Sequence, residues 1–224
     1  LKSCPNDSIQ LSLRPPTQEL WFIRKPKLEE AFLSAVIMGI VFVQNVTMLE
    51  VWSSILAWLE GVTGTTSYYV TFTITFVIAM LIPISMLGLA SLVARKTNGE
   101  SLLQNFTRFG YALIALDMAG HIAHNLFHLL AEGKSILFTG LALFGQEAGH
   151  GLSPALVSME VIQGLQFALI GLGFLGSLYI IYRVVRNTYP TEKRWGTLLP
   201  YASLMVVLAA MNLYLFILPM AMRM

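Results

Sequence analysis

Five long stretches of the chain consist almost entirely of apolar residues, and short polar segments separate them. A helix that crosses the hydrocarbon core of a bilayer needs about 20 mostly apolar residues. By this measure the sequence predicts an all-α integral membrane protein with about five transmembrane helices. The predicted spans are residues 30–49, 68–93, 109–131, 155–182 and 196–220.

Two shorter apolar segments are predicted to form short interfacial helices. Segment 51–59 carries Trp52 and Trp58, as expected of an amphipathic helix that lies at the membrane surface. Segment 134–144 is too short to cross the bilayer, so we expect an interfacial or re-entrant piece there. Pro83 falls inside the second span and is predicted to kink that helix.

The 14 lysine and arginine residues predict how the chain is oriented. Five precede the first span, three lie between the second and third, and four lie between the fourth and fifth. These twelve share one side of the membrane, and only Lys134 and Arg223 fall on the other. By the positive-inside rule the N-terminus is cytoplasmic and the C-terminus lies outside. The predicted location is a multi-pass protein of the cell inner membrane with a periplasmic C-terminus.

Composition excludes several other classes of protein. Hydrophobic residues make up 56% of the chain, mean hydropathy is +0.69, and 12% of residues are charged, against roughly a quarter in soluble domains. The single cysteine rules out a disulfide scaffold. The net charge of +2 comes from basic clusters that follow the predicted topology. We therefore expect contact with membrane lipid and no binding of nucleic acid.

The N-terminal segment contains one motif of interest. Residues 1–28 are predicted to form a cytoplasmic tail, and 29–224 the five-helix transmembrane domain. Cys4 and Pro5 match the final pair of the bacterial ferredoxin repeat C-x2-C-x2-C-x3-C-P, with Lys2 and Ser3 in its last spacer. Because the chain begins at Leu1, we expect it to be the C-terminal part of a longer protein.

From CPNDSIQLSLRPP to VQNVTML, about the first fifty residues, the sequence resembles the membrane-bound polyferredoxins related to nitrate- and nitrous-oxide-reductase accessory proteins. The resemblance implies cytoplasmic 4Fe-4S modules that move electrons across or along the membrane. A 4Fe-4S cluster needs four thiolates, and this chain has one. Cys4 is therefore a candidate ligand only of a cluster completed elsewhere, and the clusters lie outside this chain or at its edge.

Ionisable residues form a stripe in the third predicted span. Asp117, His121, His124 and His128 are spaced by four, three and four residues, which places them on one helical face. The stripe rises about 16 Å, from near the bilayer centre to the outer interface. Because ionisable groups inside a bilayer are costly, they are candidates for a functional site. Polar residues at similar depth elsewhere are His150, Glu160, Gln44, Asn45, Gln163, Gln166 and Asn212.

Several kinds of chemistry fit this set, and the sequence leaves them open. Histidines three or four apart can chelate a metal ion, with Asp117 or Glu160 as an oxygen ligand. Haem b needs axial ligands on opposite faces, so His150 or a methionine would have to face the stripe. A quinone could exchange protons with a histidine and a carboxylate. Copper is a further candidate, because thioethers favour Cu(I) and the tail carries Met220, Met222 and Met224.

The sequence thus predicts a membrane-embedded electron-transfer subunit with a His/Asp redox or metal site in the outer half of the bilayer. Iron–sulfur clusters outside this chain would feed it, and its partners would be other subunits of a membrane oxidoreductase and an extracytoplasmic electron carrier. Most of a bilayer separates the tail from the stripe, so another cofactor or a mobile quinone would have to connect them. The alternatives are a copper or other metal-binding membrane protein, in an enzyme or in metal delivery, and a structural anchor subunit. Taken one by one, the amide side chains fit simple hydrogen bonds between helices better than a functional site.

Overall fold

The computed structural model describes residues 18–23, 25–145 and 153–219, and this part of the chain is helical with short connections. Five of its helices are long and apolar enough to cross a membrane, namely α2, α4, α6, α7 and α8. The chain is therefore an all-α, multi-pass membrane protein, as predicted. The helices are α1 (Gln18–Trp21), α2 (Leu28–Val46), α3 (Val51–Thr63), α4 (Tyr68–Asn98), α5 (Leu102–Gly110), α6 (Leu113–Leu143), α7 (Met159–Thr188) and α8 (Thr191–Ile217).

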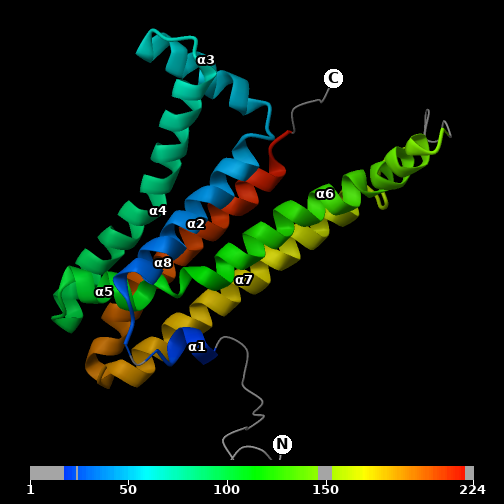
Figure 1. The fold of residues 1–224 in the computed structure, drawn as a ribbon. Coiled ribbons are helices and arrows are strands. Elements are labelled where there is room, and N and C mark those ends of the chain that lie inside the picture. Colours follow the sequence, from blue (N-terminus) through cyan, green and yellow to red (C-terminus); the bar gives the residue numbers. More distant parts are fainter. Residues whose placement is uncertain (1–17, 24, 146–152, 220–224) are drawn as a thin grey trace, which may run out of the picture.

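The long helices are arranged as two groups that share one end. Figure 1 shows α2 beside α8, with α4 leaning away from them towards α3. On the other side α6 and α7 run next to each other as a long antiparallel hairpin. The short helix α5 closes the end at which α4 stops and α6 begins. The bundle therefore has a tight end near α5 and a more open end where α2 and α8 finish.

Small residues allow α6 and α7 to pack closely. A Cβ atom placed on Gly173 would lie 2.4 Å from the Cβ of Ala119, and one on Gly176 would lie 3.1 Å from the Cβ of Ala115. Helix association in lipid depends on such close backbone approach, because the surrounding chains are as apolar as the helices. The backbone N–H of Leu116 also donates to the Ser177 hydroxyl over 3.2 Å. These contacts hold the hairpin together as one unit.

The predicted end of the third span, at residue 131, is wrong. Segment 134–144 is not a separate interfacial or re-entrant piece, because α6 continues without a break from Leu113 to Leu143. The returning chain supports the helix at this point: Lys134 N–H donates to Pro154 O over 3.0 Å, and Leu130 O accepts from Leu156 N–H over 2.7 Å. Gly133 makes room for this approach, since a Cβ there would lie 2.6 Å from a methyl carbon of Leu156.

The start of the same span also differs from the prediction. Phe109 belongs to the short helix α5, and the spanning helix begins only at Leu113. A capping box starts α5: the Ser101 hydroxyl accepts from Gln104 N–H over 3.3 Å, and the Gln104 side chain accepts from Ser101 N–H over 3.0 Å. This pair is a recognised signal for a helix start. Its S-x-x-Q pattern was therefore already visible in the sequence.

Two further predictions concern α3 and α4. The helix expected at 51–59 is confirmed and extends to Thr63, while its place at the membrane surface stays a prediction. Pro83 lies inside α4, and the helix continues through it from Tyr68 to Asn98. The helix is therefore not interrupted at Pro83, and the kink expected there stays a prediction.

A buried polar cluster closes the end of the bundle next to α5. The Arg108 guanidinium donates to Glu100 Oε1 (2.5 Å) and to the Tyr189 hydroxyl (2.8 Å), and that hydroxyl donates to Glu100 Oε2 (2.7 Å). Burial, followed by the hydrogen bond to Glu100, raises the pKa of Tyr189 above its usual range. The cluster ties the α4–α5 connection to the end of α7, on the side that carries most of the basic residues.

Candidate functional site

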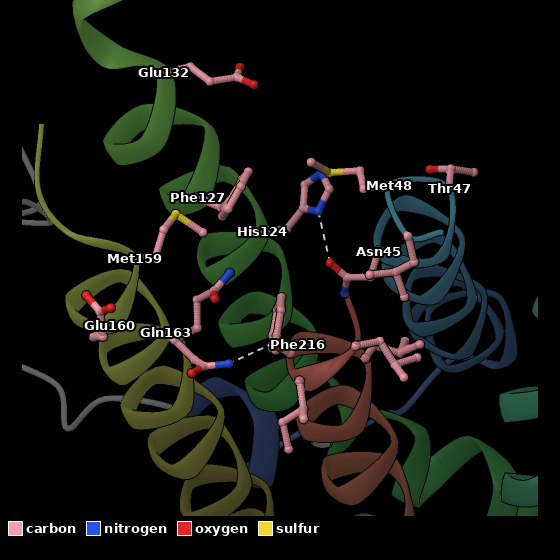
Figure 2. Close-up of a pocket in the computed structure, with 15 residues that line it drawn as sticks. Asn45, Thr47, Met48, His124, Phe127, Glu132, Met159, Glu160, Gln163 and Phe216 are labelled. Atoms are coloured by element: carbon pink, nitrogen blue, oxygen red, sulfur yellow. Dashed lines mark hydrogen bonds between the residues drawn. The ribbon is translucent and has the colours of Figure 1, made fainter. Parts of the chain in front are cut away.

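A cavity of about 720 Å³ lies between α2, α6, α7 and α8, at the ends of α2 and α8 that are remote from α5. Pockets for small molecules are typically about 300–1,000 Å³. Figure 2 shows that its walls mix polar and aromatic side chains from all four helices and from the turn after α2. The lining residues are Asn45, Thr47, Met48, Leu49, His124, Phe127, Glu132, Met159, Glu160, Gln163, Gln166, Leu215, Phe216, Ile217 and Leu218.

Several of the polar residues singled out in the sequence meet at this cavity. Asn45 comes from α2, His124 from α6, and Glu160, Gln163 and Gln166 from α7. The helical spacing put each on one face of its own helix, and packing of the helices turns those faces towards each other. Five of the polar residues named from the sequence therefore line one cavity, whereas Gln44, Asp117, His121, His128 and Asn212 do not line it.

His124 is held in a fixed orientation by Asn45. The Nδ1 atom of His124 lies 2.9 Å from the Oδ1 atom of Asn45, and both side chains are buried. An amide oxygen can only accept a hydrogen bond, so Nδ1 carries the proton of this contact. The other ring nitrogen, Nε2, is then the atom that can gain or lose a proton or bind a ligand. Figure 2 shows this pair at the wall between α2 and α6.

Two glutamines on α7 connect the walls of the cavity. Gln163 Nε2 donates to Phe216 O of α8 over 3.1 Å, and Gln166 Nε2 donates to Ala123 O of α6 over 3.2 Å. Hydrogen bonds of this kind commonly bridge helices in membranes. The glutamines therefore have the structural role that the sequence left open for them, and they also line the cavity.

The histidine stripe does not gather around one point. Within residues 18–23, 25–145 and 153–219, no three His, Cys, Asp or Glu side chains come together as a metal-ion site would require. His124 lines the cavity, whereas His121 and His128 are not among its lining residues. His128 Nδ1 instead lies 3.4 Å from Glu132 Oε2, one turn further along α6. Residues on one face of a helix are separated along its axis, and a second helix would have to complete the ligand set.

Asp117 lies deeper in the bundle than the cavity. It is 3% exposed, and neither carboxyl oxygen has a hydrogen-bond partner among the described residues. Asn212 of α8 is also fully buried, with its amide nitrogen 3.0 Å from Leu208 O and 3.7 Å from Met38 Sδ. Asp117 and Asn212 are therefore interior groups and not cavity-lining ones.

The prediction missed some residues, and others fall outside the described part of the chain. Met48, Met159, Phe127, Glu132 and Phe216 line the cavity but were not singled out. Glu132 follows His128 by four residues, so the stripe could have been extended to it. The methionines and phenylalanines gave no signal, because apolar residues fill every span. The candidate positions outside the described residues are Cys4, His150, Met220, Met222 and Met224.

No protein-family model, curated protein or solved structure matches this chain. Fold and cavity together define its class: an all-α, multi-pass membrane protein with a mainly apolar cavity that carries a few polar side chains between its spanning helices. What the protein does is therefore argued from the chemistry of that cavity.

Proposed function

We propose that this chain is a membrane-embedded electron-transfer subunit and that its cavity binds a quinone. The observation that carries the proposal is the cavity between α2, α6, α7 and α8, in which Asn45 orients His124 for proton exchange. Of the three ligands that the sequence left open, a quinone fits this cavity best, because the lining combines apolar and aromatic surface with a few polar side chains.

The walls supply both kinds of contact that a quinone head group needs. Phe127 and Phe216 provide aromatic surface, and Thr47, His124 and Gln166 bring polar groups for the two oxygens of the ring. Binding sites for such molecules are mostly apolar with a few placed polar groups. Because the cavity lies between spanning helices, a lipid-soluble ligand reaches it without leaving the bilayer.

The reaction at the site is the reduction of a quinone by two electrons and two protons to a quinol. His124 gives one proton from Nε2 and keeps its Nδ1–H bond to Asn45 in both protonation states. Glu132 and Glu160 line the same cavity and are candidates for the second proton. The electrons come from iron–sulfur clusters outside this chain.

Electrons from the N-terminal side have to cross most of the membrane to reach this cavity. Leu28 and Asn45 lie at opposite ends of α2, and 17 residues of helix span about 26 Å. A further redox group, held by another subunit of the complex, therefore has to carry the electrons along this path. This requirement is the reason for proposing a subunit and not a self-sufficient enzyme.

A second candidate is a haem or copper site at the same histidine. Met48 and Met159 line the cavity together with His124, and Figure 2 shows the Met48 sulfur on the same side of the cavity as the imidazole ring. Histidine and methionine together hold haem iron in cytochromes, and thioethers favour Cu(I). This candidate differs from the first in requiring a metal in the purified protein.

Binding of a short-tailed quinone to the purified chain in nanodiscs tests the proposal, with quenching of tryptophan fluorescence as the signal. We expect saturable binding that His124→Ala weakens by about tenfold or more, the loss of one buried polar contact. His121→Ala is the matched control, since it removes the same side chain from the same helix but not from the cavity lining. Equal binding by wild type and His124→Ala contradicts the proposal. A haem absorbance band or stoichiometric copper favours the second candidate.

A further inference from the structure

Asp117 is a carboxyl group enclosed near the middle of the membrane-spanning region. Gly120, one turn after it, packs on Val41, because a Cβ on that glycine would lie 2.8 Å from Val41 Cγ1. Figure 1 shows that α2 and α6 run in the same direction. Counting back three residues on each helix from the Gly120–Val41 contact therefore places Asp117 level with Met38, about halfway along α2. Its exposed fraction is 3%. A buried carboxylate that lacks a partner is so costly that the group takes up a proton instead.

Within the described residues, no fixed positive charge pairs with Asp117, whose carboxyl oxygens have no hydrogen-bond partner there. Residues 31–46 of α2, 161–178 of α7 and 202–213 of α8 contain no ionisable side chain. In α5 the one ionisable residue is Arg108, which is already bound to Glu100 and Tyr189. The other titratable groups on the helices packed around Asp117 are, in α6, His121, His124, His128, Glu132 and Lys134; in α2, Glu29 and Glu30; in α7, Glu160, Tyr179, Tyr182, Arg183 and Arg186; and in α8, Glu192, Lys193, Arg194, Tyr201 and Tyr214.

The side of Asp117 that faces α5 is closed by apolar packing. Leu113 and Leu116 are fully buried there, and the Phe109 ring stacks on the Tyr201 ring with centroids 3.8 Å apart. The Tyr201 hydroxyl donates to the Ser91 hydroxyl over 3.2 Å and so is engaged within the bundle. A proton has no polar route out of Asp117 in that direction among these residues.

Polar groups do continue from Asp117 towards the cavity. His121 is one turn further along the same face of α6, about 6 Å along the axis, and His124 follows at about 10 Å. Asn212 contributes from α8, with its Oδ1 atom 3.5 Å from a Cβ placed on Gly120. That oxygen is buried and has no hydrogen-bond partner within the described residues. His121 and His124 on α6 and the buried Asn212 amide on α8 are therefore the polar groups that follow Asp117 in the direction of the cavity.

We propose that Asp117 is a proton-storage site that serves the cavity through His121. It is a neutral carboxylic acid at rest, and it passes its proton by way of His121 to His124 after His124 has protonated the quinone. In this step the O–H bond of Asp117 breaks, an N–H bond forms at His124 Nε2, and no electron moves. The carboxylate is reloaded by the same route from the cavity. This use of the stored proton rests on the proposed function, whereas protonation of Asp117 and its exchange through His121 do not.

Infrared spectroscopy of the full chain in nanodiscs at neutral pH tests the site directly. We expect the C=O band of a protonated carboxylic acid, which moves in D2O and is absent in Asp117→Asn. Asp117→Leu, which has the same branching without polar atoms, gives a second measurement should the amide variant not fold. Glu160→Gln is the control that retains the band, since Glu160 is exposed. A band that persists in both Asp117 variants, or that is missing in the wild type, overturns the proposal.

The rate at which this band shifts in D2O tests the route. Replacing His121 by Leu is expected to slow the exchange by about 100-fold, the lower end of what a positioned proton-transfer group contributes. An unchanged rate overturns the route through His121. Neither measurement needs a quinone, so a wild-type protein that shows the band and the slowed exchange but binds no quinone refutes the proposed function alone.

Discussion

The Nδ1 atom of His124 and the Oδ1 atom of Asn45 are 2.9 Å apart, and this contact links α6 to α2 at the wall of the cavity. The Nδ2 atom of Asn45 is buried and has no hydrogen-bond partner among the described residues. Only the amide oxygen of Asn45 is therefore used by the surrounding protein. The asparagine sets which nitrogen of His124 remains available for chemistry.

Replacing Asn45 by Leu is expected to weaken quinone binding by about tenfold. The change removes the acceptor and leaves the His124 Nδ1–H group buried and unpaired, which costs about 1–3 kcal/mol. A fluorescence titration of the variant in nanodiscs measures the effect. Gln44→Leu is the control, because Gln44 is the adjacent amide but does not line the cavity. Equal losses in the two variants contradict a specific role for Asn45.

Replacing Gly173 by Ala is expected to destabilise the α6–α7 hairpin. The added Cβ would lie 2.4 Å from the Cβ of Ala119 and 2.9 Å from the backbone oxygen of Ala115, so the helices have to move apart. Overpacking of this kind costs about 1–3 kcal/mol. Thermal unfolding in detergent should show a lower midpoint. Gly171→Ala, on the same helix with no atom within 4 Å of the new Cβ, should leave the midpoint unchanged.

Removing the hydroxyl of Tyr189 tests the polar cluster next to α5. Tyr189→Phe loses the hydrogen bonds of the hydroxyl to Arg108 and Glu100. The half-buried ion pair between Arg108 and Glu100 then lacks the hydroxyl that bonds to both of its members. We expect a loss of stability of about 1–3 kcal/mol, measured by chemical unfolding. Tyr182→Phe serves for comparison, since its exposed hydroxyl contacts the Arg186 side chain one turn away. A similar small effect of both substitutions would show that the cluster adds little stability.

Orientation in the membrane can be tested by labelling single cysteines in a Cys4→Ser background. The distribution of basic residues predicts that Lys134→Cys reacts with an impermeant reagent applied outside intact cells, and that Lys193→Cys reacts only after permeabilisation. Lys193 lies near the start of α8, and Lys134 lies in α6 beyond the end of the predicted third span, on the opposite side of the predicted membrane. The reverse pattern of labelling would invert the assigned topology.

The apolar runs were sufficient to predict the five spans, because helix formation in lipid depends mainly on the length of such runs. They could not predict that α6 continues past Gly133, since that depends on two hydrogen bonds with the returning chain, in which Lys134 N–H donates to Pro154 O and Leu156 N–H donates to Leu130 O. The helical period likewise placed Asp117 and His124 on one face. Which of the stripe residues would line a cavity depends on how α6 is rotated against α2 and α8, and no single segment encodes that rotation.

The close contact between Gly173 and Ala119 has a mechanical consequence for the cavity. Because this close contact limits how far α6 and α7 can slide or separate, these two helices form one stiff unit, and α2 and α8 face it across the cavity. A molecule that enters the cavity pushes these helices apart. The resulting strain falls on the few hydrogen bonds that connect the helices across the cavity. The hydrogen bond between His124 Nδ1 and Asn45 Oδ1 is one of these. The contact that fixes the proton on the imidazole is therefore also a contact that is strained when α2 and α6 are pushed apart.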